Sequence, residues 1–216
     1  MEISHLRREY TQAGLSLEHL AKTPFEQFAY WFRQTQQAGI PEPNAMSLAT
    51  ASREGIPSVR TVLLKHFSDN GFVFFTNYTS KKALDITENP QAALLFPWLT
   101  LERQVIVRGS VEKITKTESL RYFASRPRDS QLGAWVSRQS SVITSRQSLE
   151  VKLNAMKQKF SEGEVPLPSF WGGYRVIPNH IEFWQGRPNR LHDRFIYSKI
   201  DSNKPLEQWK IERLSP

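Results

Sequence analysis

The chain of 216 residues contains no cysteine. This absence excludes disulfides, thiolate metal ligands and a cysteine nucleophile. The five histidines are scattered and show neither an H-x-x-x-H nor an H-E-x-x-H spacing, so a protein-bound metal is not expected. The sequence also lacks the glycine-rich signatures of a P-loop and of a Rossmann dinucleotide site.

Long apolar runs are missing as well. No stretch approaches the ~20 residues that a membrane-spanning helix needs, and the first residues contain no apolar signal-peptide core. We therefore expect a cytoplasmic protein without a membrane partner. The net charge of +8 would suit nucleic acid, but the basic residues form no long block and no nucleic-acid-binding motif is present. Dispersed arginines and lysines that converge on a small anionic ligand fit the charge equally well.

Hydrophobic periodicity predicts a mainly β protein with helices (α+β), with a mobile N-terminal segment over 1–22 and a single domain over 23–216. Strands are predicted over 45–51, 58–67, 71–77, 94–98, 101–114, 174–185, 193–198 and 207–214. Helices are predicted over 23–39, 80–88, 117–125, 128–137 and 148–160. The aromatic stripe Phe25, Phe28, Trp31 and Phe32 of the first helix is interpreted as core packing. Because the first five strands have no long helix between them, we expect an antiparallel sheet curled into a barrel.

The stretch 181–195 contains two predicted strands joined by a turn that is rich in glycine, proline and asparagine. Its charged residues include Arg187, Arg190, His192 and Arg194. Arginine is a planar fork of donors that suits phosphates, carboxylates and flat polar rings, and histidine changes charge near neutral pH. A solvated, salt-bridged hairpin is the alternative, and we expect Arg187, at the turn, to be solvated.

Two segments carry cations in positions that suit anions. In the predicted strand 58–67, Arg60 and Lys65 fall on opposite faces, so one strand could address two anionic groups. An edge strand whose charges prevent aggregation is the alternative. Lys81 and Lys82 follow Ser80 in the first turn of a helix, where free N–H groups and the helix dipole favour an anion.

Two further groups of polar residues suit a ligand. Tyr122, Arg126 and Ser130 are spaced by four, and their donors would form a phosphate pocket, although Pro127 is expected to break the helix that carries them. Small donors follow at Gln139 and Ser140. Gln104, early in a long strand, offers both a donor and an acceptor to the edge of a ring.

Together these segments resemble the pyridoxine/pyridoxamine 5'-phosphate oxidase family of FMN enzymes. The resemblance covers almost the whole chain and is most specific at residues 60–65, 95–98, 102–104, 125–131, 165–173 and 181–195. It implies an antiparallel split β-barrel that forms a homodimer, with an FMN-binding groove between the subunits. Phe75, Lys81 and Glu42 stand where the family more often has Tyr, Arg and Asp.

The resemblance also implies roles for single residues. FMN would be bound by Arg60, Val62, Leu63, Leu64, Lys65, Phe75, Thr76, Lys81, Lys82, Gln104, Gln139, Ser140, Trp184 and Arg194. The substrate would be bound by Arg7, Arg8, Tyr10, Lys65, Tyr122, Arg126, Ser130, Arg190 and His192. Arg190 and His192 would be the catalytic pair over the pyridine ring, acting first as orienting groups, and Arg7, Arg8 and Tyr10 would form a lid.

The implied reaction converts pyridoxine 5'-phosphate or pyridoxamine 5'-phosphate to pyridoxal 5'-phosphate. A hydride passes from substrate C4' to flavin N5, O₂ accepts the electrons and yields H₂O₂, and the amine substrate also releases ammonia. Two phosphorylated ligands need two cationic pockets, which agrees with the dispersed basic residues. The alternatives are a split-barrel FMN reductase that uses NAD(P)H, and a basic RNA-binding or vitamin B6 carrier protein.

Overall fold

The computed structural model describes residues 2, 9–11, 14–200 and 209–216. Its strands are β1 (Ala45–Ala51), β2 (Pro57–Leu63), β3 (His66–Ser68), β4 (Gly71–Asn77), β5 (Gln91–Trp98), β6 (Arg103–Lys113), β7 (Trp171–Gln185), β8 (Asp193–Lys199) and β9 (Trp209–Leu214). Its α-helices are α1 (Pro24–Gln37), α2 (Lys81–Glu88), α3 (Lys116–Ser125), α4 (Arg128–Val136) and α5 (Arg146–Lys159). Short 3₁₀ segments lie at Leu17–His19, Leu99–Leu101 and Pro188–Arg190.

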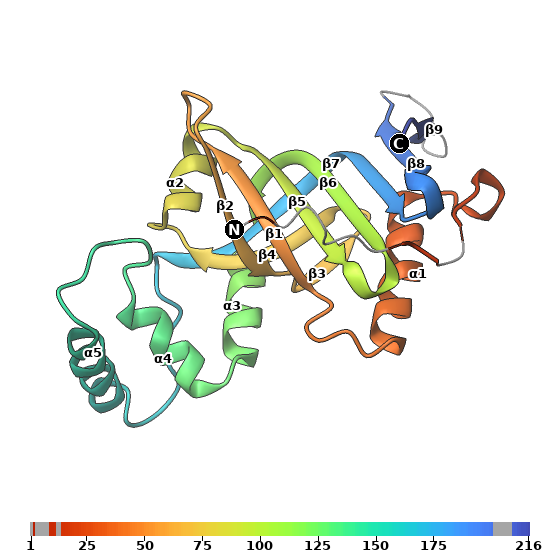
Figure 1. Ribbon diagram of the computed structural model, residues 1–216. Coiled ribbons are helices and arrows are strands. Elements are labelled where there is room, and N and C mark those ends of the chain that lie inside the picture. Colours follow the sequence, from red (N-terminus) through yellow and green to blue (C-terminus); the bar gives the residue numbers. More distant parts are fainter. Residues whose placement is uncertain (1, 3–8, 12–13, 201–208) are drawn as a thin grey trace.

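All strands belong to one curled antiparallel sheet, which confirms the expected fold. The order is β2-β1-β5-β6-β7-β4-β3, while β8 pairs with the second half of β7 and β9 pairs with β8. Figure 1 shows α4 and α5 as a lobe at one end of the sheet, with α3 between this lobe and the strands. The β8–β9 pair and α1 lie at the opposite end.

The predicted strand 58–67 is wrong as a single strand, because it breaks after Leu63 into β2 and β3. At the break the backbone changes hydrogen-bond partners: the Leu64 N–H donates to Asn44 O (2.8 Å) and the Lys65 N–H donates to Val73 O (2.9 Å). The chain therefore leaves the β1 edge of the sheet and joins the β4 edge. This crossing curls the sheet, and strand alternation no longer relates Arg60 to Lys65.

The interior of the curled sheet is filled by aromatic side chains, including those of α1. Thr23 and Glu26 form a capping box that fixes where α1 begins. Phe28 is fully buried and its ring lies 4.9 Å from Phe96 and 5.0 Å from Phe72, in edge-to-face contacts. The aromatic stripe of this helix is thus core packing, as predicted.

The long strand β7 connects the two ends of the molecule. Its pairing with β6 shifts register between Arg108 and Gly109, which leaves Asn179 as an extra residue on β7. A Cβ on Gly109 would lie 1.9 Å from Ile177 O, so only glycine allows the two backbones to approach this closely. The bulge bends the sheet here.

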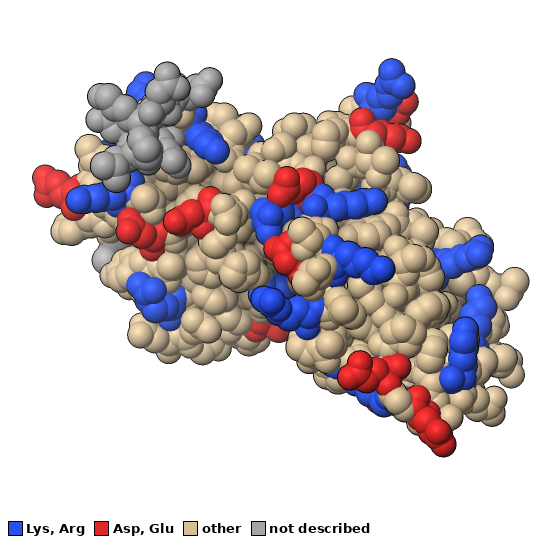
Figure 2. All heavy atoms as spheres, turned by 180° about the vertical axis from the view of Figure 1, so that it is seen from behind, with Lys and Arg blue, Asp and Glu red and all other residues tan. Residues whose placement is uncertain are grey.

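Charge is dispersed over the outside of the fold. On the face shown in Figure 2, Lys and Arg side chains are spread over the surface with Asp and Glu among them. In the part of the chain that the structure describes, no helix is long and apolar enough to cross a bilayer. No group of three metal-binding side chains is found among those same residues.

Candidate active site

A cavity of about 880 Å³ lies where the edge of the sheet meets α3 and α4. We call it the main cavity. Its lining comes from β2, Lys65, β4, α2, the α3–α4 junction, the segment after α4 and the start of β7. The predicted site residues among its lining are Arg60, Val62, Leu63, Lys65, Phe75, Thr76, Lys82, Tyr122, Arg126, Ser130, Gln139 and Ser140.

Lys82 is a cation buried in the wall of this cavity, with 6% of its surface exposed. Its Nζ donates to Gln139 Oε1 (2.9 Å), Thr76 Oγ1 (3.3 Å) and Ser80 Oγ (3.4 Å). Among the residues that the structure describes, no carboxylate forms an ion pair with it. Burial, followed by the neighbouring charge of Arg60, lowers the pKa of Lys82 to about 8. Such a buried ammonium without a counter-ion is suited to an anionic ligand.

Arg60 lies beside Lys82 and is fixed by a buried network. Its Nη1 donates to Thr50 Oγ1 (2.7 Å) and to Leu48 O (3.1 Å). The Thr50 hydroxyl donates in turn to Asp85 Oδ2 (2.8 Å), and Arg60 Nη2 lies 3.9 Å from the same oxygen. Burial would raise the pKa of Asp85, but hydrogen bonds from Lys81 and Thr50 lower it overall, so the carboxylate is ionised. The guanidinium is thereby oriented before any ligand binds.

A third cation, Arg126, enters the cavity at the junction of α3 and α4. Pro127 ends α3 as predicted, and the kink allows Tyr122, Arg126 and Ser130 to line one cavity from two helices. The Arg126 guanidinium lies 4.7 Å from the centre of the Trp171 ring. Its Nη1 is buried and has no hydrogen-bond partner among the described residues. An unsatisfied buried donor of this kind indicates a place for an acceptor.

An aromatic wall adjoins Arg126. The rings of Phe75 and Tyr122 stack with centroids 3.9 Å apart, and Phe75 stacks on Trp171 at 5.4 Å. Gly173 lies behind the wall, where a Cβ would come within 3.0 Å of Phe75 Cε1. The main cavity therefore combines cationic groups with a flat apolar surface.

Three predicted cofactor residues, Leu64, Lys81 and Ser140, differ in how they are placed relative to the main cavity. Ser140 has a positive φ of 72°, and its Oγ accepts from the Lys81 backbone N–H (3.2 Å), which joins this loop to the start of α2. The Lys81 side chain is paired with Asp85 and does not line the main cavity. Leu64 is buried in the core and does not line the cavity either.

The other predicted residues lie at the far end of the sheet. Gln104, Trp184 and Arg194 occupy one row across β6, β7 and β8, because Gln104 pairs with Trp184 and Trp184 pairs with Arg194. Arg194 Nε donates to Glu182 Oε1 (2.8 Å), which orients the guanidinium. Together with Tyr10, Arg190 and His192, these three residues form what we call the hairpin cluster.

His192 has a defined hydrogen-bonding state. Its Nδ1 accepts from the Arg187 backbone N–H (3.1 Å), and since that group can only donate, the proton of the neutral ring is on Nε2. Burial, followed by the charges of Arg190 and Arg194, lowers the pKa of His192. The ring centroid lies 4.6 Å from that of Trp184 and 5.6 Å from that of Tyr10. The histidine is thus neutral, with an N–H available to a ligand.

The turn of the hairpin lies between the two strands, as predicted. Asn189 and Arg190 both adopt positive φ, 56° and 61°, in the segment before β8. The expectation that Arg187 is merely solvated is wrong, because its Nε lies 3.5 Å from Asp193 Oδ2.

One chain does not bring the main cavity and the hairpin cluster together. Trp171, in the cavity wall, and Trp184, in the cluster, lie near opposite ends of β7. At about 3.3 Å per residue this strand would be on the order of 45 Å long if it were straight. Arg7 and Arg8, the remaining predicted site residues, lie outside the described residues.

Sequence reasoning did not find several residues that organise these sites. Thr50 and Asp85 orient Arg60, and Trp171 supports Arg126. Each is far in sequence from the residue it contacts. Asp85 left one weak signal, an acidic residue four positions after Lys81 on the helix predicted over 80–88.

Comparison with known proteins gives concordant results over both parts of the chain. Residues 32–160 match the family "Pyridoxamine 5'-phosphate oxidase", and residues 171–216 match "Pyridoxine 5'-phosphate oxidase C-terminal dimerisation region". A protein of Rippkaea orientalis named pyridoxine/pyridoxamine 5'-phosphate oxidase is 61% identical over the whole length of both chains.

Solved structures agree with the fold. PhzG from Burkholderia lata, in complex with tetrahydrophenazine-1-carboxylic acid, superposes with a TM-score of 0.85 and 26% identity, covering 92% of this chain and 95% of its own. A pyridoxamine 5'-phosphate oxidase-related, FMN-binding protein of Nostoc punctiforme superposes with a TM-score of 0.70. At 17% identity over 92% of this chain and 99% of that one, it supports the fold alone.

Proposed function

The chain belongs to the pyridoxine/pyridoxamine 5'-phosphate oxidase family of oxidoreductases, and we propose that it oxidises pyridoxine 5'-phosphate and pyridoxamine 5'-phosphate to pyridoxal 5'-phosphate. FMN is the proposed cofactor and O₂ the electron acceptor, with H₂O₂ as product and ammonia as a further product from the amine. The observation that carries the proposal is the presence of two separate cationic groups in one cavity. Lys82 and Arg60 form one, and Arg126 at the junction of α3 and α4 provides the other, while Lys65 lines the same cavity. Cofactor and substrate each carry one phosphate.

The residues of the main cavity fit FMN. Lys82 offers a buried ammonium without a carboxylate partner among the described residues, and Arg60 offers a guanidinium that Thr50 and Asp85 already orient. Charge-assisted hydrogen bonds from these groups suit a phosphate dianion. Val62, Leu63 and Thr76 would line the flavin beside them. When bound, FMN supplies the hydride acceptor that no amino-acid side chain provides.

The second cationic group fits the substrate phosphate. Arg126 has a buried Nη1 that lacks a partner among the described residues, and Tyr122 and Ser130 add hydroxyl groups that line the same cavity. Burial lowers the pKa of Arg126, yet the guanidinium of arginine stays charged at any physiological pH. Binding of a phosphate would give this donor a hydrogen-bond partner. Part of the binding free energy would then come from removing the penalty of a buried, unpaired N–H group.

A homodimer would complete each site. Gln104, Trp184 and Arg194 are proposed to surround the flavin ring, and Arg190 and His192 the pyridine ring, but all five lie at the other end of the sheet from the main cavity. A second copy related by a two-fold axis would place its hairpin cluster at the main cavity of the first copy. The hairpin cluster of the first copy would lie at the main cavity of the second. Two identical sites would result, each built from both chains.

His192 is proposed to orient the substrate rather than to remove a proton. Its Nδ1 is occupied by the Arg187 backbone N–H, and its Nε2 carries the proton of the neutral ring. The side chain can therefore donate a hydrogen bond to a ring substituent, but it has no free basic nitrogen. Holding the pyridine ring in a reactive position is the contribution we assign to it.

Replacement of His192 tests this assignment. A His192→Gln variant keeps a donor of similar reach and should lose less than about tenfold in kcat, whereas loss of a general base costs about 10²–10⁴-fold. Single-turnover reduction of bound FMN under anaerobic conditions would measure the step directly. A loss of several hundredfold, with substrate affinity intact, would contradict the orienting role.

The titration of Lys82 predicts that FMN binding weakens at high pH. Below about pH 8 the ammonium is already charged, whereas above it the free protein holds a neutral amine that must take up a proton on binding. The dissociation constant should therefore rise by up to about tenfold per pH unit above that point. Fluorescence titration with FMN measures this slope. A Lys82→Arg variant, which stays charged, should not show it; an unchanged slope in that variant would assign the effect to another group.

The decisive experiment is an oxidase assay on the FMN-loaded protein. Formation of pyridoxal 5'-phosphate from each of the two substrates should consume one O₂ and release one H₂O₂ per turnover. A matched assay with pyridoxine lacking the phosphate should show far weaker substrate use, because the Arg126 group would have no anion to bind. FMN bound without turnover of either phosphorylated substrate would reject the proposed function.

A further inference from the structure

Tyr10 is the N-terminal member of the hairpin cluster and packs directly on two of its other side chains. The Tyr10 ring meets Trp184 edge to face, with centroids 5.7 Å apart, and meets His192 in the same manner at 5.6 Å. Gly186 makes this contact possible, since a Cβ at that position would lie 2.7 Å from Tyr10 Cγ. Tyr10 thus covers the two rings that the proposed function assigns to flavin and substrate.

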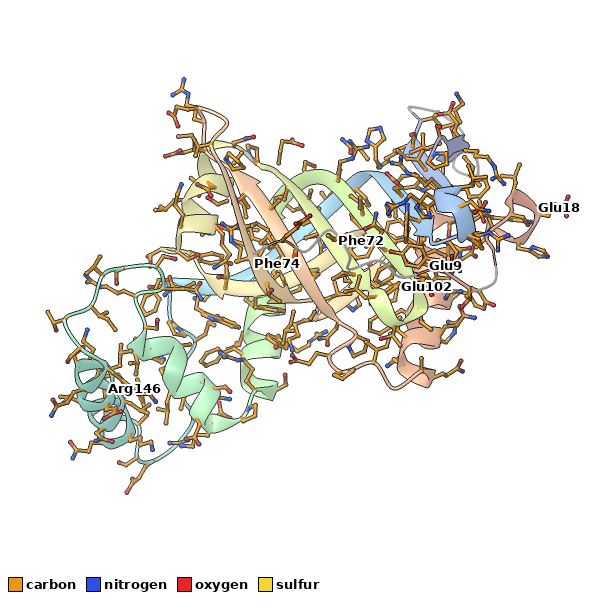
Figure 3. All side chains as sticks on the ribbon, in the orientation of Figure 1. Glu9, Glu18, Phe72, Phe74, Glu102 and Arg146 are labelled. Atoms are coloured by element: carbon orange, nitrogen blue, oxygen red, sulfur yellow. The ribbon has the colours of Figure 1, made fainter. Side chains whose placement is uncertain are left out.

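Two carboxylates hold the backbone that follows Tyr10. The Thr11 N–H donates to Glu102 Oε2 (2.9 Å), and the Leu15 N–H donates to Asp193 Oδ2 (3.0 Å). Hydrogen bonds from a backbone amide to a carboxylate are charge-assisted and stronger than neutral ones. Figure 3 shows Glu9 and Glu102 at the end of the sheet where β8 lies, far from Arg146 in the helical lobe.

Glu102 is built into the framework of the hairpin. Only 2% of its surface is exposed, and its backbone has a positive φ of 55°, which is uncommon for a residue other than glycine. Its carbonyl oxygen accepts from the Gly186 N–H (2.7 Å) and from Gln185 Nε2 (3.1 Å). One residue therefore fixes the end of β7 through its backbone and the N-terminal segment through its side chain.

Asp193 has the same double role on the other side of the cluster. It begins β8 directly after His192, and its carboxylate contacts Arg187 (3.5 Å) and Arg213 (3.1 Å) as well as the Leu15 amide. Gly14 lies against this group, since a Cβ there would come within 3.0 Å of Asp193 Oδ2. The carboxylate therefore connects the hairpin turn, β9 and the N-terminal segment.

We propose that Glu102 and Asp193 are positioning residues, which anchor Thr11 and Leu15, hold Tyr10 against Trp184 and His192, and thereby set the affinity for the substrate. The proposal rests on the proposed function of the site and names residues that act on the substrate through this segment. Neither carboxylate is assigned a contact with FMN or substrate. Loss of either one should release Tyr10 from the rings without disturbing the main cavity.

Variants at Glu102 test the proposal on the FMN-loaded enzyme. Glu102→Ala removes the acceptor and should raise KM for pyridoxine 5'-phosphate about tenfold or more, while Glu102→Gln, which keeps a neutral acceptor, should show an intermediate rise. FMN affinity and kcat should change less than about threefold. Glu112→Gln is the matched control, because Glu112 lies near the other end of β6, half-exposed, and pairs with Arg175. It should leave KM unchanged.

Amide hydrogen exchange supplies a readout that does not depend on activity. Exchange at Thr11 should accelerate at least tenfold in Glu102→Ala, and exchange at Leu15 should do so in Asp193→Asn. If Glu102→Ala does not fold, Glu102→Gln and Asp193→Asn carry the test. An unchanged KM, or loss of FMN along with substrate affinity, would overturn the proposal. If the parent enzyme turns over neither substrate, the proposed function fails, whereas the exchange rates still decide whether the two carboxylates hold the segment.

Discussion

An Arg60→Ala variant should bind FMN about 10- to 150-fold more weakly than the parent chain. Arg60 is held by Thr50, Leu48 and Asp85 before any ligand is present, so it loses little freedom when a phosphate binds. Removal of a charge-assisted contact of this kind costs about 1.5–3 kcal/mol, which corresponds to the stated range in affinity. Titration of the flavin-free protein with FMN, followed by flavin fluorescence, measures the change.

Riboflavin makes this experiment specific to the phosphate. It carries the same ring without the phosphate, so its affinity should be weak and equal in the variant and the parent. Arg108→Ala provides a control for overall charge, because Arg108 is exposed on β6 and does not line the main cavity. Equal FMN affinity in Arg60→Ala and Arg108→Ala would remove Arg60 from the cofactor site.

The predictions from sequence succeeded where the information is local. The helix start near Thr23, the break at Pro127 and the strands β1 and β4 each depend on a few adjacent residues, and the structure has them as predicted. The prediction failed at Leu64 and Lys65, which read as the continuation of β2. There the backbone changes strand partners, because its N–H groups donate to Asn44 O and Val73 O, which lie elsewhere in the chain. Periodicity within the segment carries no trace of that exchange.

The same distinction applies to the site. The cations that suit phosphates could be predicted from residue type, because an arginine or lysine at a helix start or before a proline can be recognised in the sequence. The groups that orient them could not, because Thr50 and Asp85 meet Arg60 only after β1, β2 and α2 pack together. Family resemblance supplied the assignment of Gln104, Trp184 and Arg194 to the flavin. The division of the predicted residues between two ends of the sheet became apparent only from the strand register.

That division has a consequence for oligomers. Each active site would combine the main cavity of one copy with the hairpin cluster of the other. A substitution in the cavity and a substitution in the cluster would then affect the same site only when they lie on different chains. If both halves of a site came from the same chain, the two substitutions would affect the same site only when they lie on that one chain. Mixed dimers that contain two different damaged chains therefore separate the two arrangements without any need for a structure of the complex.

Mixed dimers of an Arg126→Ala chain and an Arg190→Ala chain should recover about half of the parent activity. Each homodimer alone should retain about 10% or less of kcat/KM, since each lacks a charged contact worth about 1.5–3 kcal/mol. Arg126 lines the main cavity, whereas Arg190 belongs to the hairpin cluster. In the mixed dimer one site receives both damaged halves, and the other receives two intact halves.

Two affinity tags on the two chains allow the mixed dimer to be purified after refolding or co-expression, and activity is then measured well below KM. Arg126→Ala combined with Lys65→Ala is the matched control, because both residues line the main cavity and every site would contain one damaged half. This pair should show no recovery. Absence of recovery in the Arg126→Ala and Arg190→Ala pair would exclude a site shared between subunits. Recovery in the control would show that Arg126 and Lys65 do not belong to the same half of a site. Recovery confined to the pair would require that Arg190 acts on the cavity of the other chain.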